Sequence, residues 1–353
     1  YTGYELNLDA QGVPLQNGWR EADFWVRVPH GALDGTPHGL VQYGHGLLGT
    51  GSQVGGSHNN KIAAKDKLIF FACNWTGMAS PQRNAITKMI FDFSDFHILP
   101  DHLHQGMLEF LLLGRAMRER FDQLAEIKKL GVVVDRKRMY FSGISQGGIY
   151  GGTYMALSQD VVRGHLGVPG QNYSLLLQRS VDFAPFYGVM LAAYKDPVDR
   201  AILMGAMQVL WDSADSSSYY RHIKAEPFAN TPSHDVLLAP VKGDWQVATL
   251  SNEITARSGI SIAVMAGYDV ERKVWAVQEQ AYPHKGSGLV NYSFGNPWPK
   301  PGNLPPHDDL GDPHGWARQL DVHSEQMLHF FKTGEIKDVC AGKPCVFPTK
   351  GKK

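Results

Sequence analysis

The sequence predicts an α/β protein in which a mostly parallel β-sheet is covered by helices on both faces. Short apolar runs typical of buried strands alternate with longer runs of helical pattern along most of the 353 residues, and this alternation is typical of parallel sheets. Neither an internal repeat nor a low-complexity linker divides the chain. We therefore expect one large α/β domain over residues 1–353 that carries insertions.

The individual elements follow from these runs. Strands are expected at residues 24–28, 40–43, 68–73, 139–142, 173–177, 236–239 and 260–265. Helices are expected at residues 53–65, 101–127, 146–158, 247–258 and 316–332, with Pro100 beginning the second and Gly334 in a C-cap position after the last. Residues 183–232, rich in Met, Leu, Tyr and Trp, predict a helical cap. Residues 270–313, rich in Pro, Gly and aromatic residues, predict a long ordered loop insertion.

Charge and composition narrow the class of protein. Lys plus Arg equals Asp plus Glu at 34 each, so no basic excess favours nucleic-acid binding. The most apolar helical run, 107–113, is interrupted by Glu109 and falls short of the roughly 18 residues that an integral membrane segment needs. The chain begins at Tyr1, which suggests a mature form whose signal peptide is absent from this chain.

The run Gly143-Ile144-Ser145-Gln146-Gly147 lies between a strand pattern and a helix pattern. G-x-S-x-G is typical of a tight strand-to-helix turn whose strained backbone presents a serine hydroxyl to the active site. Glycine is needed on both sides because flanking side chains would clash, and the following helix N-terminus favours developing negative charge. A glycine-rich turn alone recurs by chance, but this placement predicts that Ser145 is a nucleophile.

A second motif, His45-Gly46-Leu47-Leu48-Gly49, follows an early strand. A serine that attacks an ester needs two backbone N–H groups aimed at the carbonyl oxygen, and the amides of Leu47 and Gln146 are the expected donors. Together with Ser145-Gln146-Gly147-Gly148, this motif resembles the pairing in secreted bacterial lipases and esterases of the α/β-hydrolase superfamily. The resemblance implies the α/β-hydrolase fold, the same two oxyanion donors, and a structural role for His45. Cutinase-type polyester hydrolases usually carry Met after the nucleophile, so Gln146 departs from that subfamily.

The acid and the base are expected downstream, because a triad on this fold runs Ser, Asp, His in chain order. Asp244 follows an apolar strand and precedes a helix, so it is the expected acid; capping of that helix is its other interpretation, and Asp182 is the alternative acid. His314, in a Pro-His-Gly turn before the last helix, is the expected base, with His307 as its rival.

Cys340 and Cys345 bracket the turn-forming run Ala-Gly-Lys-Pro, which predicts a local disulfide. Because disulfides persist mainly in oxidising compartments, the pair favours a secreted or periplasmic location; two free thiols in a cytosolic tail are the alternative. The three cysteines lack the spacing of a zinc site, and His102 and His104 would point to different faces of a helix. Neither a metal nor an organic cofactor is expected.

These features predict a carboxylic ester hydrolase that forms an acyl-enzyme on Ser145. The favoured substrates are small-molecule or lipid-like esters with apolar acyl or aromatic groups, and polyesters are not excluded. Met207 and Trp211 in the cap, and Trp75 after a strand at the carboxyl edge of the sheet, are expected to contact the substrate. A serine peptidase or amidase with the same triad, and a non-catalytic hydrolase-like binding protein, are the alternatives. The sequence leaves the oligomeric state open.

Overall fold

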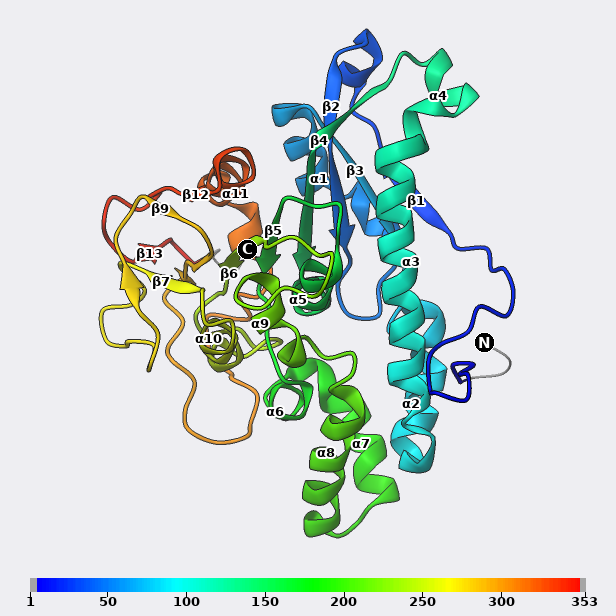
Figure 1. Cartoon of the computed structure of the whole chain (residues 1–353). Coiled ribbons are helices and arrows are strands. Elements are labelled where there is room, and N and C mark those ends of the chain that lie inside the picture. Colours follow the sequence, from blue (N-terminus) through cyan, green and yellow to red (C-terminus); the bar gives the residue numbers. More distant parts are fainter. Residues whose placement is uncertain (1–4, 350–353) are drawn as a thin grey trace.

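The computed structural model describes residues 5–349. Within them, the central sheet has nine strands in the order β1-β3-β2-β4-β5-β6-β10-β7-β8 (Figure 1). β1 pairs antiparallel with β3, and the other strands of the sheet pair in parallel. The strands are β1 (Phe24–Arg27), β2 (Pro37–Gly44), β3 (Leu68–Cys73), β4 (Val133–Ile144), β5 (Arg163–Gly167), β6 (Asp235–Ala239), β7 (Ala263–Met265), β8 (Glu279–Gln280) and β10 (Gly288–Leu289).

Two small sheets lie beside the central one. β9 (His284–Lys285) pairs antiparallel with β12 (Glu335–Ile336), and β11 (Tyr292–Ser293) pairs parallel with β13 (Cys345–Val346). The helices are α1 (Ser57–Asp66), α2 (Arg83–Phe91), α3 (Ile98–Arg120), α4 (Ala125–Lys129), α5 (Gln146–Leu157), α6 (Tyr173–Leu177), α7 (Ala184–Ala193), α8 (Pro197–Trp211), α9 (Tyr220–Lys224), α10 (Thr249–Ser258) and α11 (Asp321–Thr333). Short 3-10 helices lie at His30–Asp34, Gly51–Gly55, Ser80–Gln82, Phe93–Asp95, Phe121–Gln123, Val181–Phe183, Ser216–Ser218 and Ala317–Gln319.

The core has two halves, one on each face of the sheet. Successive strand residues point to opposite faces, so Phe71 packs in one apolar cluster and Phe70 in the other. Helices α3 and α5 contribute to the first cluster, and α1 and α11 to the second. Both faces of the parallel strands are therefore buried, which confirms the predicted sheet covered by helices on both sides.

One predicted strand is wrong. Residues 173–177 form helix α6, begun by the Asn172 side chain, which accepts the Leu175 amide at 3.1 Å. The strand of this part of the chain is instead β5, ten residues earlier. Its sequence Arg-Gly-His-Leu-Gly lacks an apolar run, but a Cβ at Gly164 would lie 2.6 Å from the Met155 sulfur, so close packing of α5 selects this segment.

The range 270–313, expected to be a loop, contains four short strands. Two of them, β8 and β10, are part of the central sheet: β8 pairs in parallel with β7, and β10 pairs in parallel with both β6 and β7. Gly288 is buried in β10, where a Cβ would lie 2.6 Å from the Ile336 side chain. β10 is only two residues long and one of them is glycine, so its sequence has no apolar alternation that would predict a strand. It forms because β6 and β7 lie on either side of it.

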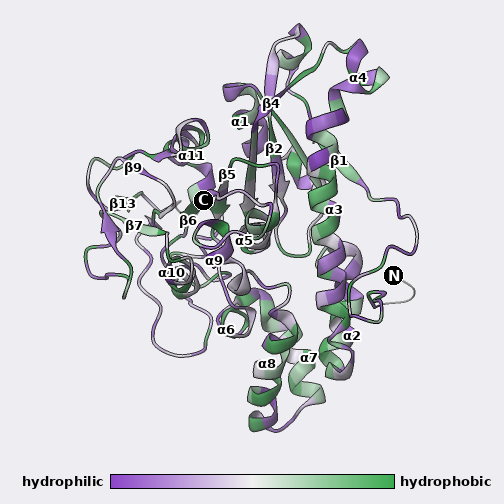
Figure 2. Cartoon of the chain, viewed as in Figure 1, coloured by the Kyte–Doolittle hydropathy of each residue, from purple (hydrophilic) through white to green (hydrophobic). Residues whose placement is uncertain are grey.

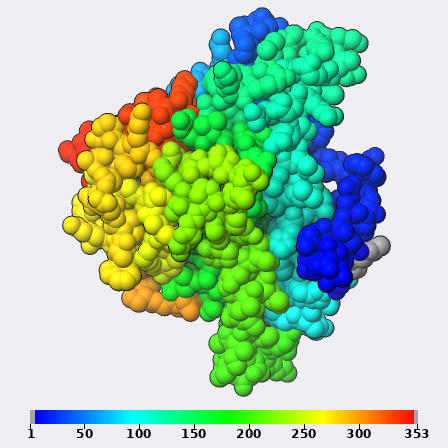
Figure 3. Space-filling model, viewed as in Figure 1, coloured from blue at the N-terminus to red at the C-terminus, as the bar shows by residue number. Residues whose placement is uncertain are grey.

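Residues 183–232 contain α7, α8 and α9. Figures 1 and 3 show α7 and α8, here called the α7–α8 segment (Ala184–Trp211), projecting from the body of the molecule. Figure 2 shows that this segment is largely hydrophobic. Its inner side chains Met190, Met204, Met207 and Trp211 are buried, whereas Ile202 and Val209 are exposed. The α7–α8 segment therefore presents one apolar side to the core and another to solvent.

Candidate active site

Ser145 lies on the turn between β4 and α5, with φ 58° and ψ −125°. This left-handed backbone conformation is strained for a residue with a side chain, and such strain is concentrated at functional sites. The turn is held by the Ser145 amide, which donates to the Gly167 carbonyl at 3.0 Å, and by the Ser145 carbonyl, which accepts from Ile149 at 2.9 Å. Neighbouring strand β5 thus fixes the serine at the end of the sheet.

The two glycines that flank Ser145 are required by the approach of the backbone. A Cβ on Gly143 would lie 2.0 Å from the Gly147 carbonyl oxygen, and a Cβ on Gly147 would lie 2.0 Å from the Gly44 carbonyl oxygen. Because neither side chain fits, the G-x-S-x-G pattern follows directly from the packing of α5 against β2 and β4. A strained strand–serine–helix turn at the end of a mostly parallel sheet is the arrangement of the α/β-hydrolase fold, as predicted.

Asp244 and His314 meet although 70 residues separate them. Oδ2 of Asp244 accepts a hydrogen bond from Nδ1 of His314 at 2.7 Å, and the Asp244 side chain is buried. The other carboxylate oxygen accepts from the amides of Gln246 and Val247 at 2.8 and 2.9 Å. Asp244 therefore both closes its own turn and orients His314. It does not cap the following helix, because α10 begins at Thr249 with Ala248 as its N-cap residue, so the capping interpretation is wrong.

The charges around His314 raise the pKa of its imidazole. Burial by itself lowers the pKa of His314, but the adjacent Asp244 carboxylate, with smaller contributions from Asp312 and Asp182, raises it above the ordinary value. Since Nδ1 is occupied by Asp244, Nε2 is the ring nitrogen left for a reacting hydroxyl. This arrangement suits a base that accepts a proton and then holds it as an imidazolium.

Asp312 was not recognised in the sequence. Its Oδ1 accepts from the amides of Trp245 and His314 at 3.2 and 3.1 Å, and its Oδ2 accepts from Nε2 of Gln246 at 2.7 Å. It ties the loop of the acid to the loop of the histidine. The only sequence signal was its place two residues before His314.

The alternative acid, Asp182, and the other histidines near the end of the chain do not form the contact between Asp244 and His314. Asp182 lies near the site, and burial, with Asp244 and Asp312 nearby, raises the pKa of its carboxyl. The His307 ring stacks on Trp245, with centroids 4.5 Å apart. His323 is buried against His165, with 3.2 Å between their Nε2 atoms, and His329 contacts Glu335.

The loop with the expected oxyanion donor is built around His45. Nε2 of His45 accepts the Trp75 amide at 2.8 Å, and Nδ1 donates to the Gly46 carbonyl at 2.8 Å. Burial lowers the pKa of His45 to about 4, so the ring is neutral and bridges β2 to the loop after β3. Gln53, which sequence reasoning missed, accepts the Gly46 amide on its side-chain oxygen at 3.0 Å. These contacts order the loop, as the resemblance implied.

Gln146, the other expected donor, is the first residue of α5, where backbone N–H groups have no partner within the helix. Its side chain is engaged elsewhere, since Nε2 donates to the Met78 carbonyl at 2.9 Å. That bond anchors the loop after β3 against the start of α5. The main-chain amide of Gln146, rather than its side chain, is thus the candidate oxyanion donor.

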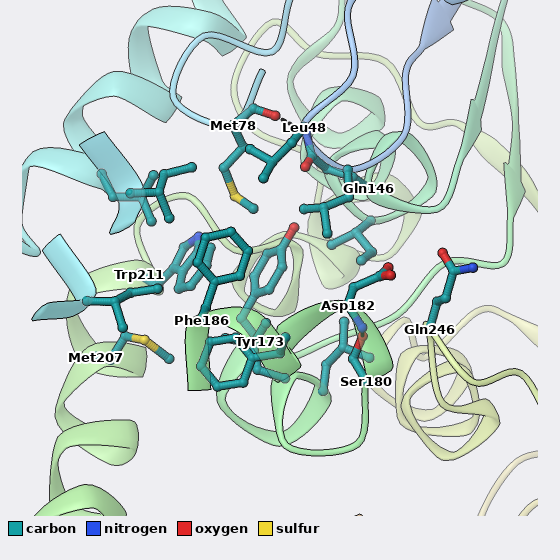
Figure 4. A pocket seen from close by; sticks show the side chains of 18 of the residues that line it. Leu48, Met78, Gln146, Tyr173, Ser180, Asp182, Phe186, Met207, Trp211 and Gln246 are labelled. Carbon is teal, nitrogen blue, oxygen red and sulfur yellow. Dashed lines mark hydrogen bonds between the residues drawn. The ribbon is translucent and has the colours of Figure 1, made fainter. Parts of the chain in front are cut away.

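Two chambers meet at Ser145. The first is apolar, with a cavity volume of about 60 Å³, and runs between α2, α5, α6 and the α7–α8 segment (Figure 4). The second is a polar, more open chamber with a cavity volume of about 520 Å³. Both are lined by Leu47, Leu48, Ser145, Asp182, Phe186 and Gln246. His314 lines only the polar chamber.

Of the three side chains expected to contact substrate, two line the apolar chamber. Met207 and Trp211 lie across it from Gln146 in Figure 4. Trp75 does not line either chamber; it stacks on Phe110 of α3 with centroids 3.5 Å apart and lines a separate pocket of about 210 Å³ beside α3. The Trp75 amide donates to Nε2 of His45, so Trp75 helps to hold the loop that carries Leu47 and is not part of a chamber wall.

Cys340 and Cys345 form a disulfide with a Cα–Cα distance of 5.3 Å, and Cys73 is a buried free thiol. Across residues 5–349, no cluster of His, Cys, Asp and Glu has the arrangement of a metal site. In the same range no helix combines the length and the apolar character of a membrane span.

Comparison with known proteins gives a distant likeness of fold. Neither a protein-family model nor a curated protein sequence matches this chain. Similar solved structures include an acetyl xylan esterase from Paenibacillus sp. R4 (14% identity, 93% of this chain and 82% of that chain, TM-score 0.49). Another is an S-formylglutathione hydrolase from Agrobacterium tumefaciens (14% identity, 88% and 89%, TM-score 0.47). This chain spans 40% of a Pyrococcus horikoshii acylaminoacyl peptidase (12% identity, 90% of this chain, TM-score 0.47).

Proposed function

We propose that this protein is a serine hydrolase that cleaves carboxylic esters with apolar acyl or aromatic groups. The observation that carries the proposal is the position of Ser145. It lies on a strained turn where an apolar chamber meets a polar one, and a histidine held by a buried aspartate lines the polar chamber.

In the proposed reaction, Oγ of Ser145 attacks the ester carbonyl while Nε2 of His314 takes its proton. The main-chain amides of Leu47 and Gln146 stabilise the oxyanion, helped by the N-terminus of α5. His314 then gives the proton to the leaving alcohol, which departs and leaves an acyl-enzyme. Water activated by the same histidine releases the acid, and Asp244 stabilises the imidazolium in both halves.

The two chambers assign the two halves of the ester. Since His314 must protonate the leaving oxygen, the alcohol half lies on the side of the histidine, in the polar chamber. The acyl half then occupies the apolar chamber, where Met207 and Trp211 close the far side. An aliphatic or aromatic acyl group gains free energy there by leaving water. In this proposal, residues 183–232 act as the cap that builds the acyl chamber.

The disulfide fits an extracytoplasmic location, because such bonds persist mainly in oxidising compartments. We propose that the protein acts there on small-molecule or lipid-like esters.

The decisive experiment compares wild type with Ser145→Ala. The exchange is nearly isosteric, and loss of a triad serine costs on the order of a million-fold in turnover. Wild type should hydrolyse para-nitrophenyl hexanoate and be labelled by a fluorophosphonate at Ser145, whereas the variant should do neither and should keep its thermal unfolding temperature. Labelling at another residue, or activity that survives in the variant, contradicts the assignment. Faster cleavage of matched anilides than of esters would instead favour an amidase.

A further inference from the structure

The polar chamber carries two guanidinium groups that the proposed chemistry does not use. Arg83, the first residue of α2, and Arg318, just after the His314 turn, both line it together with Ser145 and His314. Within residues 5–349 neither guanidinium has an ion pair or a hydrogen bond. Arg83 is exposed, and Arg318 is partly buried.

Local structure gives no reason for a cation at Arg83. A positive side chain in the first turn of a helix is opposed by the helix dipole, and α2 has no acidic residue in that turn to offset it. Arg318 likewise lies without a carboxylate partner, beside the partly buried ring of His58, whose pKa is lowered by burial and by the charge of Arg318. Both charges are therefore available to a group that enters the chamber.

Among the described residues that line the polar chamber, the two arginines outnumber the carboxylates. Asp182 is the one carboxylate among the described residues that line it, and it stands at the junction with the apolar chamber. Burial raises the pKa of Asp182, which disfavours its charged form. Asp244 and Asp312 do not line the chamber; the Asp244 carboxylate accepts a hydrogen bond from His314, and both carboxylates raise the pKa of His314. Two unpaired arginines thus face at most one carboxylate.

We propose that the alcohol half of the substrate carries a carboxylate, which Arg83 and Arg318 bind while the acyl half fills the apolar chamber. The substrate class is an ester of a hydroxy acid, including an oligoester that ends in a free carboxylate. The planar fork of a guanidinium matches a carboxylate with two parallel hydrogen bonds, which gives direction as well as charge. The inference rests on the proposed function, because it assumes that the alcohol lies beside His314.

The test uses two hexanoate esters that differ only in charge, one of meta-hydroxybenzoate and one of meta-hydroxybenzamide. In wild type at low salt, kcat/KM should be about fourfold to twenty-fivefold higher for the carboxylate ester, because each of the two partly exposed ion pairs contributes a factor of about two to five. Arg83→Gln and Arg318→Gln should each lower this ratio, and the double variant should bring it to about one. Arg120→Gln, at the end of α3 and outside both chambers, is the matched control and should keep the wild-type ratio.

Ionic strength gives an independent readout. Raising it from about 0.02 M to about 0.5 M should lower the ratio in wild type, because salt screens exposed charges, and should leave the double variant unchanged. If wild type cleaves the benzamide ester but shows no preference for the carboxylate, or if the arginine variants keep the ratio, this inference is wrong and the proposed function stands. If neither ester is cleaved while the protein is folded, the proposed function itself fails.

Discussion

Shortening Met207 to alanine should move the preferred acyl chain of the enzyme to longer esters. Met207 is buried on α8 and lines the apolar chamber on the side opposite Gln146 (Figure 4). Alanine removes the three heavy atoms beyond Cβ and leaves their space open at the far side of the chamber. An acyl chain that ends against the methionine in wild type can then extend by about three methylenes.

The size of the effect follows from burial. Each methylene that leaves water for the chamber contributes up to about 0.8 kcal/mol, which is about fourfold in kcat/KM. In wild type, kcat/KM should therefore rise from acetate and level off where the chain reaches Met207 and Trp211. In Met207→Ala the rise should continue through up to about three further carbons, while acetate, which does not reach that depth, should change little.

The assay is kcat/KM for para-nitrophenyl esters from acetate to dodecanoate. Removing a buried methionine costs about 2–5 kcal/mol of stability, so the matched control is Met117→Ala. Met117 is equally buried, on α3, and lines neither chamber. It should lower the unfolding temperature without moving the preferred chain length. A flat or falling profile in wild type, or the same profile in both variants, refutes the acyl chamber.

Two further outcomes are expected. Gly147→Ala places a Cβ 2.0 Å from the Gly44 carbonyl oxygen and should lower the free energy of unfolding by about 1–3 kcal/mol or more in chemical denaturation. Gly188→Ala, with open space around its Cβ, should not, and equal stability of the two variants would contradict the packing argument. Because Asp244 raises the pKa of His314 and the base must be neutral, kcat/KM should fall with decreasing pH through a pKa above 6.5. Asp244→Asn should move this limb to lower pH and reduce the maximum, and an unmoved limb would show that His314 is not the titrating base.

The nucleophile turn could be predicted because its constraints are local. Strand, serine and helix are consecutive in the chain, and the glycines at 143 and 147 are demanded by backbone groups that any such turn brings close. Asp244 and His314 were predicted from chain order and turn chemistry, and the structure brings them to 2.7 Å. Gly334 ends α11 in the left-handed conformation for which glycine was expected.

The remaining features depend on contacts between distant segments. The sequences of β5 and β10 do not predict strands. They form strands because each pairs with a neighbouring strand on both sides. Trp75 follows a strand at the edge of the sheet where a pocket wall was expected, yet it stacks on Phe110 of α3 and lines a separate pocket.

The sequence by itself thus determined the fold class, the nucleophile turn and the order of its proposed partners, since these follow from steric rules within a few residues. Only the tertiary structure decided that Asp312 joins the two loops, that His314 lies on the polar side of Ser145, and that two arginines share its chamber. The physical reason is that side chains from β4, α2 and the loops around Asp244 and His314 acquire a common environment only when the sheet and its covering helices bring their ends together.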